Sequence, residues 1–225
     1  MVNIWEKAKK GRPKILNLVE AQALIDAAVP DPDIFVYVVL GLFCGVRREE
    51  LLRLSVHNLH DDFRIEITET ESKTRGWRTV PLPLVARVML RDVWEQWEEL
   101  AELTEPDEKD PRLRLVDPLN FRKRWEKVRR AAGWGRTAAG VKLWPKTCLR
   151  HSFASYWYAC TKDKPGLLTL LGHNTDAVTF SHYLRPIKVN DPYEYFQLAH
   201  DKEVNAELEA ALNSEPDKRK ALLPA

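Results

Sequence analysis

The chain has 225 residues, and 44% of them are hydrophobic, which is enough for a sizeable core in one large domain or two small ones. Lys and Arg number 35 against 33 Asp and Glu, so the net charge of +2 neither demands nor excludes nucleic acid, and any anion site must be local. No apolar run reaches the roughly 20 residues that span a bilayer, and no signal peptide precedes the first charged residues. These features predict a cytoplasmic globular protein.

The three cysteines are odd in number, lie in apolar or helical segments and show no C-x-x-C spacing. We therefore expect buried, reduced thiols at Cys44, Cys148 and Cys160.

The N-terminal part of the chain predicts an arm followed by two helices. Residues 1–16 are basic, contain Gly-Arg-Pro and show little periodicity, which is typical of a linker or docking arm. Asn17 with Glu20 three residues later is a helix N-cap signature. The stretch from Asp33 to Gly45 is apolar on nearly every face, which predicts a central, buried helix.

The hydrophobic period then changes to that of a strand. Ile65 and Ile67 alternate with polar residues, a polar turn containing Gly76 follows, and alternation resumes from Trp77 to Leu82. This pattern predicts a β-hairpin.

Helical spacing returns after the hairpin, interrupted by a charged, proline-bounded surface loop from Pro106 to Pro118. Further helices are predicted at Leu84–Leu103, Leu119–Ala132, Leu149–Cys160, Pro165–Leu171, Thr175–Leu184 and Pro192–Leu212. The fold class that follows is mainly α with a small antiparallel β-sheet, an α+β fold.

Two arginines are candidate anion contacts. In CGVRREELLRL, Arg47 begins a helix with Glu50 three residues later on the same face; the alternative is a solvated ion pair. In KTCLRHSFASYWYA, Arg150 and His151 stand at the entry to a helix whose other face is core. Here the alternative is a helix-end arginine that makes capping or ion-pair contacts.

Three further candidates are ambiguous when each is taken alone. Lys73 falls at the hairpin turn, where its ammonium could reach over a ligand or simply be solvated. His173 follows Gly172, which can end a helix, and a histidine there is often a structural group. Tyr183 comes ten residues later, beside His182, and most tyrosines pack in the core with the hydroxyl at its rim.

The order and spacing of these candidates resemble the tyrosine recombinase (phage integrase) family over nearly the whole chain. The segment GVRREEL resembles the first arginine box of the family, and CLRHSFAS resembles its second arginine box. The segment SKT followed by RTVPLP resembles the hairpin that carries the catalytic lysine. The segment LGH, with a tyrosine ten residues later, resembles the last two boxes. The catalytic set implied by this resemblance, with Glu50 in support, is Arg47, Lys73, Thr147, Arg150, His173 and Tyr183. Thr147 departs from the family pattern, which usually has histidine there, and would supply a weaker, neutral donor.

The chemistry of DNA cleavage gives each of these residues a role. Attack on a phosphodiester passes through a pentacoordinate state, whose charge Arg47 and Arg150 would hold by forking onto the nonbridging oxygens. By resemblance, Tyr183 attacks the phosphorus to form a 3′-phosphotyrosine and the 5′ hydroxyl departs, with no ATP, metal or other cofactor. Lys73 would protonate the leaving oxygen, and His173 would hydrogen-bond a nonbridging oxygen.

Other residues are assigned to the DNA backbone or to no site. The expected backbone contacts are Arg48, Arg75, His151 and His182. A metal site made of His151, His173 and His182 has no matching ligand spacing, so no metal is expected.

The resemblance also implies a domain organisation. Residues 17–200 would form the catalytic DNA breaking and rejoining domain, and residues 1–16 a basic linker at the point where family members usually connect to an N-terminal DNA-clamping domain. The chain would then be either a catalytic fragment or a naturally short relative of this family. Residues 201–225 comprise a helix with Leu208 and Leu212 on one stripe and a polar tail. In this family such a helix often docks on the neighbouring protomer; the alternative is that it packs on its own domain.

Three functions remain open at this point. The first is a site-specific recombinase that binds double-stranded DNA as a homo-tetramer on paired sites, is associated with the nucleoid when bound, and is a monomer without DNA. The second is DNA relaxation like that of a type IB topoisomerase. The third, raised by Thr147, is a catalytically weak or silent DNA-binding module.

Overall fold

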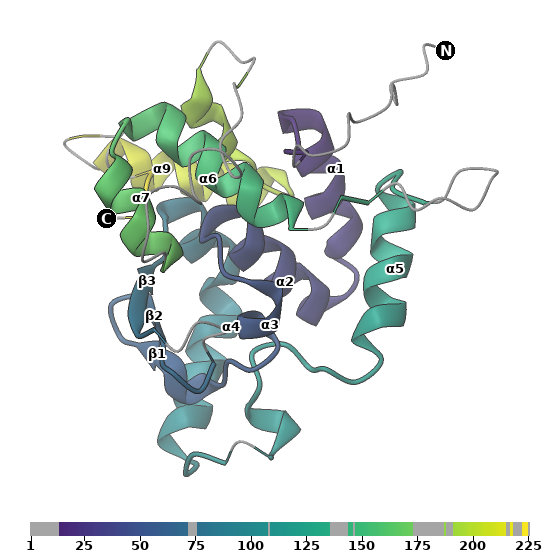
Figure 1. The fold of residues 1–225 in the computed structure, drawn as a ribbon, viewed down its shortest axis with the longest axis vertical. Helices are drawn as coiled ribbons and strands as arrows, with labels where there is room; N and C mark the ends of the chain where they lie inside the picture. The colour runs from purple at the N-terminus through teal and green to yellow at the C-terminus, as the bar shows by residue number, and fades with distance from the viewer. Residues whose placement is uncertain are drawn as a thin grey trace.

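The structure is a computed structural model of the chain, and it is mainly helical with one small sheet (Figure 1). The described residues are 14–71, 76–107, 109–135, 144–145, 147–172, 187, 191–214, 217 and 222–224. The fold class predicted from the sequence is confirmed. Among the described residues, no helix is long and apolar enough to cross a membrane.

The described part of the chain contains α-helices and shorter 3-10 helices. The α-helices are α1 (Leu18–Ala28), α2 (Pro32–Phe43), α3 (Arg48–Leu51), α4 (Leu84–Glu102), α5 (Phe121–Ala131), α6 (Cys148–Thr161), α7 (Lys164–Leu171) and α9 (Lys202–Ser214). The 3-10 helices are Val56–Asn58, Pro111–Leu113 and Pro192–Gln197.

The predicted helix start at Asn17 is confirmed by its cap. The side chain of Asn17 accepts a hydrogen bond from the backbone of Glu20 at 2.8 Å, and the Glu20 carboxylate accepts one from the backbone of Asn17 at 2.9 Å. The core already includes the end of the predicted arm, because Leu16 is fully buried and its backbone N–H donates to Ser152 of α6.

Helix α2 is the centre of the fold, as its apolar sequence predicted. It begins with Asp31 as N-cap and Pro32 in the first turn, and nearly every residue from Ile34 to Phe43 is buried. The helices packed around it are α1, α3, α4, α5 and α6. A helix that is apolar on all faces is stable only with such cover.

The sheet contains the predicted hairpin and one additional strand. Strands β1 (Leu59–His60), β2 (Arg64–Ile67) and β3 (Arg78–Pro81) are antiparallel in the order β1-β2-β3. Strand β1 was not predicted, because two residues are too short to show alternation. The tip of the hairpin, residues 72–75, lies outside the described residues.

The predicted helix from Pro192 to Leu212 is wrong in its continuity. The chain forms a 3-10 helix that ends at Gln197, and α9 begins only after Asp201. The side chain of Asp201 accepts a hydrogen bond from the backbone of Val204 at 2.8 Å, which caps the start of α9. The predicted helix 175–184 lies outside the described residues.

Helix α9 packs on α4 of its own chain. Leu208 and Leu212 are buried, as their shared stripe predicted, and Glu207 forms an ion pair with Arg91 of α4 at 2.9 Å. Docking of this helix on a neighbouring protomer stays a prediction. The predicted free thiols are confirmed, although Cys160 is only half-buried.

Candidate active site

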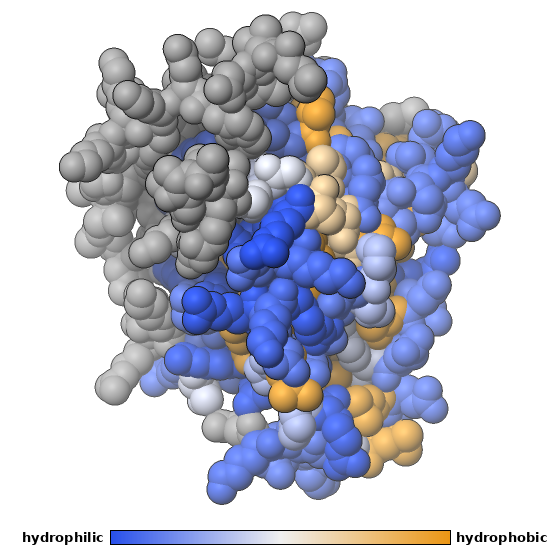
Figure 2. All heavy atoms as spheres, turned by 90° about the vertical axis from the view of Figure 1, so that its right-hand side faces the viewer, coloured by the Kyte–Doolittle hydropathy of each residue, from blue (hydrophilic) through white to orange (hydrophobic). Residues whose placement is uncertain are grey.

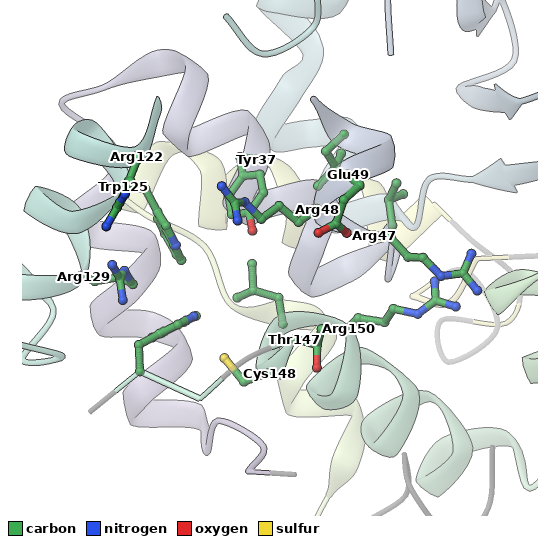
Figure 3. A pocket seen from close by; sticks show the side chains of 14 residues that line it. Tyr37, Arg47, Arg48, Glu49, Arg122, Trp125, Arg129, Thr147, Cys148 and Arg150 are labelled. Carbon is green, nitrogen blue, oxygen red and sulfur yellow. The ribbon is translucent and has the colours of Figure 1, made fainter. Parts of the chain in front are cut away.

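The two candidate arginines lie side by side, although 103 positions separate them in the sequence (Figure 3). Arg47 comes from the turn between α2 and α3, and Arg150 from the first turn of α6. The connection that presents them is tight: Gly45 has a positive φ of 64°, and a Cβ there would lie 2.3 Å from the ring of Phe153. The fold therefore assembles a local cluster of positive charge.

Glu50 holds Arg47, as their spacing predicted. Nη1 of Arg47 donates to Oε1 of Glu50 at 2.7 Å, and the backbone N–H of Arg47 donates to Oε2 at 3.0 Å. The arginine side chain is 13% exposed and the glutamate is fully buried. The solvated ion pair that the sequence left open is therefore excluded.

Arg150 is fixed by backbone carbonyls. Its Nη1 donates to the carbonyl oxygen of Gly45 at 2.7 Å, and its Nη2 donates to that of Leu171. Arg47 also reaches this end of α7, with Nη2 3.4 Å from the carbonyl oxygen of Gly172. Both guanidinium groups thus meet the end of the helix that directly precedes His173 in the sequence.

A third arginine, Arg78, was not predicted from the sequence. It opens β3, is 5% exposed, and forks onto the Glu50 carboxylate with N–O distances of 3.1 and 2.6 Å. Its Nε also donates to the carbonyl oxygen of Leu170 at 3.2 Å. The signal was present in the sequence: strand alternation places Arg78 on the buried face with Val80, and a buried cation needs a carboxylate partner.

Gly172 ends α7 with a positive φ of 59°, as a glycine at that position predicted. A Cβ at this position would lie 3.0 Å from Cδ of Arg78, so a side chain would push against the buried arginine. Arg78 therefore ties together β3, α3 and the end of α7.

Thr147 stands at the N-cap of α6 in a left-handed conformation, with φ 57° and ψ 15°. A β-branched residue rarely adopts positive φ, and such a backbone costs roughly 1–3 kcal/mol. The residue is exposed and lines the same pocket as both arginines. Thr147 therefore lies in the same pocket as the two candidate arginines, and its catalytic role stays a prediction.

The remaining predicted residues divide into two groups. Arg48 is exposed on α3, whereas His151 is only 7% exposed, and the DNA-backbone contacts predicted for both stay predictions. Five predicted residues lie outside the described part of the chain: Lys73, Arg75, His173, His182 and Tyr183. Within the described residues, no group of three His, Cys, Asp or Glu side chains could hold a metal ion.

The sequence matches no protein-family model and no curated protein, whereas the three-dimensional fold matches solved structures. The XerA recombinase superposes with a TM-score of 0.55 at 19% sequence identity, over 92% of this chain and 68% of that chain. The chain has a tyrosine recombinase catalytic-domain-like fold. The resemblance inferred from the sequence boxes is thereby confirmed at the level of the fold.

Two structures of the XerH site-specific recombinase bound to difH substrates also match. The post-cleavage complex has a TM-score of 0.50 at 22% identity, over 73% of this chain and 48% of that chain. The pre-cleavage complex has a TM-score of 0.48 at 24% identity, over 77% and 50%. The chain with the recombinase-like fold thus spans about half the length of each XerH chain.

The Glu50 carboxylate should make the stability of the fold sensitive to acid. Burial raises its pKa, but the hydrogen bond and charge of Arg78 and the charge of Arg47 outweigh burial and lower the pKa from 4.5 to about 2. A lowered pKa in the folded state stabilises the fold above pH 4.5, and this contribution is lost as the pH falls towards 2. Urea unfolding of the parent and Glu50→Gln should show a difference of roughly 3 kcal/mol that shrinks across this window. A difference independent of pH would contradict this assignment.

Proposed function

We propose that the protein is a DNA strand transferase of the tyrosine recombinase type. The observation that carries this proposal is the convergence of Arg47 and Arg150, from distant parts of the chain, in a tyrosine recombinase catalytic-domain-like fold. Two guanidinium groups that protein contacts hold in place suit the nonbridging oxygens of a phosphodiester in its pentacoordinate state, because their remaining N–H groups can donate hydrogen bonds to these oxygens.

Double-stranded DNA is the proposed substrate. Helix α5 carries six basic residues and one acidic residue, and the side of the molecule on which it lies is largely hydrophilic (Figure 2). The XerH structure that superposes with a TM-score of 0.50 is a complex with a palindromic difH substrate. A basic, exposed helix beside a phosphate site supports backbone contacts with DNA.

The proposed reaction conserves the energy of the phosphodiester. The Tyr183 oxygen loses its proton and bonds to phosphorus, the bond from phosphorus to the 5′ oxygen breaks, and that oxygen takes up a proton. A 3′-phosphotyrosine and a free 5′ hydroxyl result, and reversal with another 5′ hydroxyl rejoins DNA. The site-specific recombinase, acting as a tetramer on paired sites, is the form of this activity that we propose.

Covalent trapping tests the proposal. The substrate is a duplex that carries the recombination site from the DNA flanking the gene, with a nick beside the cleavage position. After attack, the short strand that ends at the nick dissociates, so the cleaved DNA cannot be rejoined. A protein–DNA adduct should then accumulate on a denaturing gel. Absence of any adduct, with DNA binding intact, would favour the silent DNA-binding module that Thr147 raises. Relaxation of supercoiled plasmid by monomers without sequence preference would instead favour a type IB topoisomerase-like activity.

Lys73 is the proposed general acid, and a bridging sulfur tests this role. Lys73→Ala should cleave ordinary DNA roughly 10²-fold more slowly, because the leaving alkoxide lacks a proton donor. A substrate with sulfur at the 5′ bridging position should restore the rate, since a thiolate leaves without an acid. Lys109→Ala is the control, because this lysine lies in a loop outside the recombinase-like boxes. Lack of rescue would remove Lys73 from this role.

Thr147→His should increase the cleavage rate roughly tenfold with little change in DNA affinity. Imidazole is a longer donor that can carry charge near neutral pH, and it acts mainly in the transition state. Histidine also tolerates the observed positive φ better than threonine, so the variant should fold. Single-turnover cleavage at saturating protein measures the effect, with Thr147→Ala as the variant that has neither donor. A slower Thr147→His enzyme that folds and binds DNA would refute this prediction.

A further inference from the structure

A pocket of about 660 Å³ opens beside the arginine pair, between α2, α3, α5 and the start of α6 (Figure 3). Its volume lies within the range of roughly 300–1,000 Å³ that is typical of small-molecule sites. The part that the proposed cleavage reaction does not use is lined by Tyr37, Arg48, Arg122, Trp125, Arg129 and Trp144, and the pocket also contains one lining carboxylate, that of Glu49.

This part of the pocket has cations of its own. In Figure 3, the side chains of Arg47 and Arg150 extend away from α5, whereas Arg122 and Arg129 approach the pocket from α5. Arg48 turns towards Tyr37, in the direction opposite to its neighbour Arg47. The pocket therefore contains a group of cations that is separate from the guanidinium groups of the arginine pair.

These cations have no carboxylate partner among the described residues. Arg124 and Arg130, on the same helix, form ion pairs with acidic side chains, but Arg48, Arg122 and Arg129 form none. Arg129 is half-buried, its Nε has no hydrogen-bond partner, and burial lowers its pKa. The carboxylate of Glu126 acts on Arg129 only at a distance, and a half-buried guanidinium that forms no ion pair is a ready contact for a ligand anion.

Aromatic rings form the other half of the lining. The guanidinium of Arg129 lies 5.5 Å from the ring centroid of Trp125 and 5.9 Å from that of Trp144. The two tryptophan rings meet at 88°, and Tyr37 meets Trp125 at 66°. Phosphate binds to guanidinium forks, and bases stack on aromatic and guanidinium planes. An inorganic phosphate would contact only the guanidinium groups and not the aromatic and apolar side chains of the lining.

We propose that this pocket binds a nucleotide that is unstacked from the DNA near the cleavage position. Its phosphate would contact Arg48, Arg122 and Arg129, and its base would lie against Trp144 at the edge of the pocket. That this nucleotide belongs to DNA rests on the proposed function. A free mononucleotide carries the same phosphate and base, so the pocket could bind it through the same contacts. Base extrusion costs stacking and pairing energy, so the pocket should prefer a base that is already unpaired.

Calorimetric titration of the full chain tests the pocket itself. The probes are deoxyadenosine 5′-monophosphate, deoxyadenosine and inorganic phosphate. The mononucleotide should bind at least about tenfold more tightly than either part, because only it uses both the cations and the rings. Arg129→Gln should weaken its binding about tenfold. Arg130→Gln, at the adjacent, ion-paired and exposed position of α5, is the matched control and should bind like the parent.

Two outcomes of this titration would overturn the proposal. One is a mononucleotide that binds no better than inorganic phosphate, and the other is equal weakening by Arg129→Gln and Arg130→Gln. Melting temperatures of both variants identify any loss of fold.

Trp144→Phe replaces Arg129→Gln if the latter does not fold. The smaller ring offers less area for stacking, so the variant should bind the mononucleotide several-fold more weakly than the parent and inorganic phosphate equally well. Parental affinity for the mononucleotide in Trp144→Phe would overturn the proposal.

Fluorescent duplexes then identify the source of the nucleotide. A duplex with one extrahelical 2-aminopurine should bind the parent about tenfold more tightly than the same duplex with the 2-aminopurine paired. This preference should fall in Arg129→Gln and persist in Arg130→Gln. Mononucleotide binding without preference for the bulged duplex would overturn the DNA origin and assign the pocket to a free nucleotide.

The two proposals fail separately. A protein that forms no covalent DNA adduct, yet binds the mononucleotide through Arg129, would refute the strand-transferase function and retain the pocket. A protein that forms the adduct, yet shows no nucleotide binding that depends on Arg129, would refute the pocket alone.

Discussion

Tyr183→Phe should abolish the covalent protein–DNA adduct, lowering its formation by at least about 10³-fold, with unchanged fold and DNA affinity. Phenylalanine keeps the ring and removes only the oxygen that attacks phosphorus, so binding persists while the covalent step is lost. The measurement is the yield of adduct on a denaturing gel with the nicked duplex, together with DNA affinity by gel shift.

Tyr193→Phe is the matched control for this prediction. Tyr193 lies in the 3-10 helix Pro192–Gln197, and its hydroxyl donates to the carbonyl oxygen of Cys160 at 3.3 Å, which is a structural contact. Its phenylalanine variant should form the adduct at nearly the rate of the parent. Undiminished adduct in Tyr183→Phe would show that another residue is the nucleophile.

The sequence predicts local features of this fold well. The cap at Asn17, the buried helix α2 and the hairpin of β2 and β3 each depend on a short pattern of caps, apolar residues or alternation. The break at Asp201 and the two-residue strand β1 were missed. Asp201 caps α9 through the backbone of Val204, and β1 pairs with β2 over only two residues, so neither feature changes the hydrophobic period along the chain.

In the candidate site, the sequence predicts contacts within one segment but not contacts between segments. The contact of Arg47 with Glu50 follows from helical spacing, so the sequence contains it. The contacts of Arg150 with the carbonyl groups of Gly45 and Leu171 join three segments, and spacing within one segment cannot predict them. Only the family resemblance placed the two arginines in one site.

The partners of Arg78 are the clearest example of information that exists only in the assembled fold. Its own segment shows a strand, while its partner Glu50 lies 28 positions earlier and its other contact, Leu170, lies 92 positions later. The resulting network couples the arginine of the first box to the segment before His173. The role we infer for Arg78 is to position Arg47 through Glu50, without contact to DNA.

Arg78→Ala should lower the free energy of unfolding by about 3–5 kcal/mol, because it leaves the fully buried Glu50 carboxylate with only one cation. Urea unfolding measures this loss. Arg112→Ala is the control, since the arginine of its ion pair with Asp110 is exposed to solvent and its loss should leave the stability close to that of the parent.

A second change separates the buried charge from the lost packing. Adding Glu50→Gln to Arg78→Ala removes the stranded carboxylate, so the double variant should be less destabilised than the two single effects combined. Its cleavage should nevertheless stay slow, roughly 10²-fold below the parent, because Arg47 has lost the partner that orients it. A single variant Arg78→Ala within about 1 kcal/mol of the parent, cleaving at the parental rate, would contradict both the buried ion pair and the positioning role.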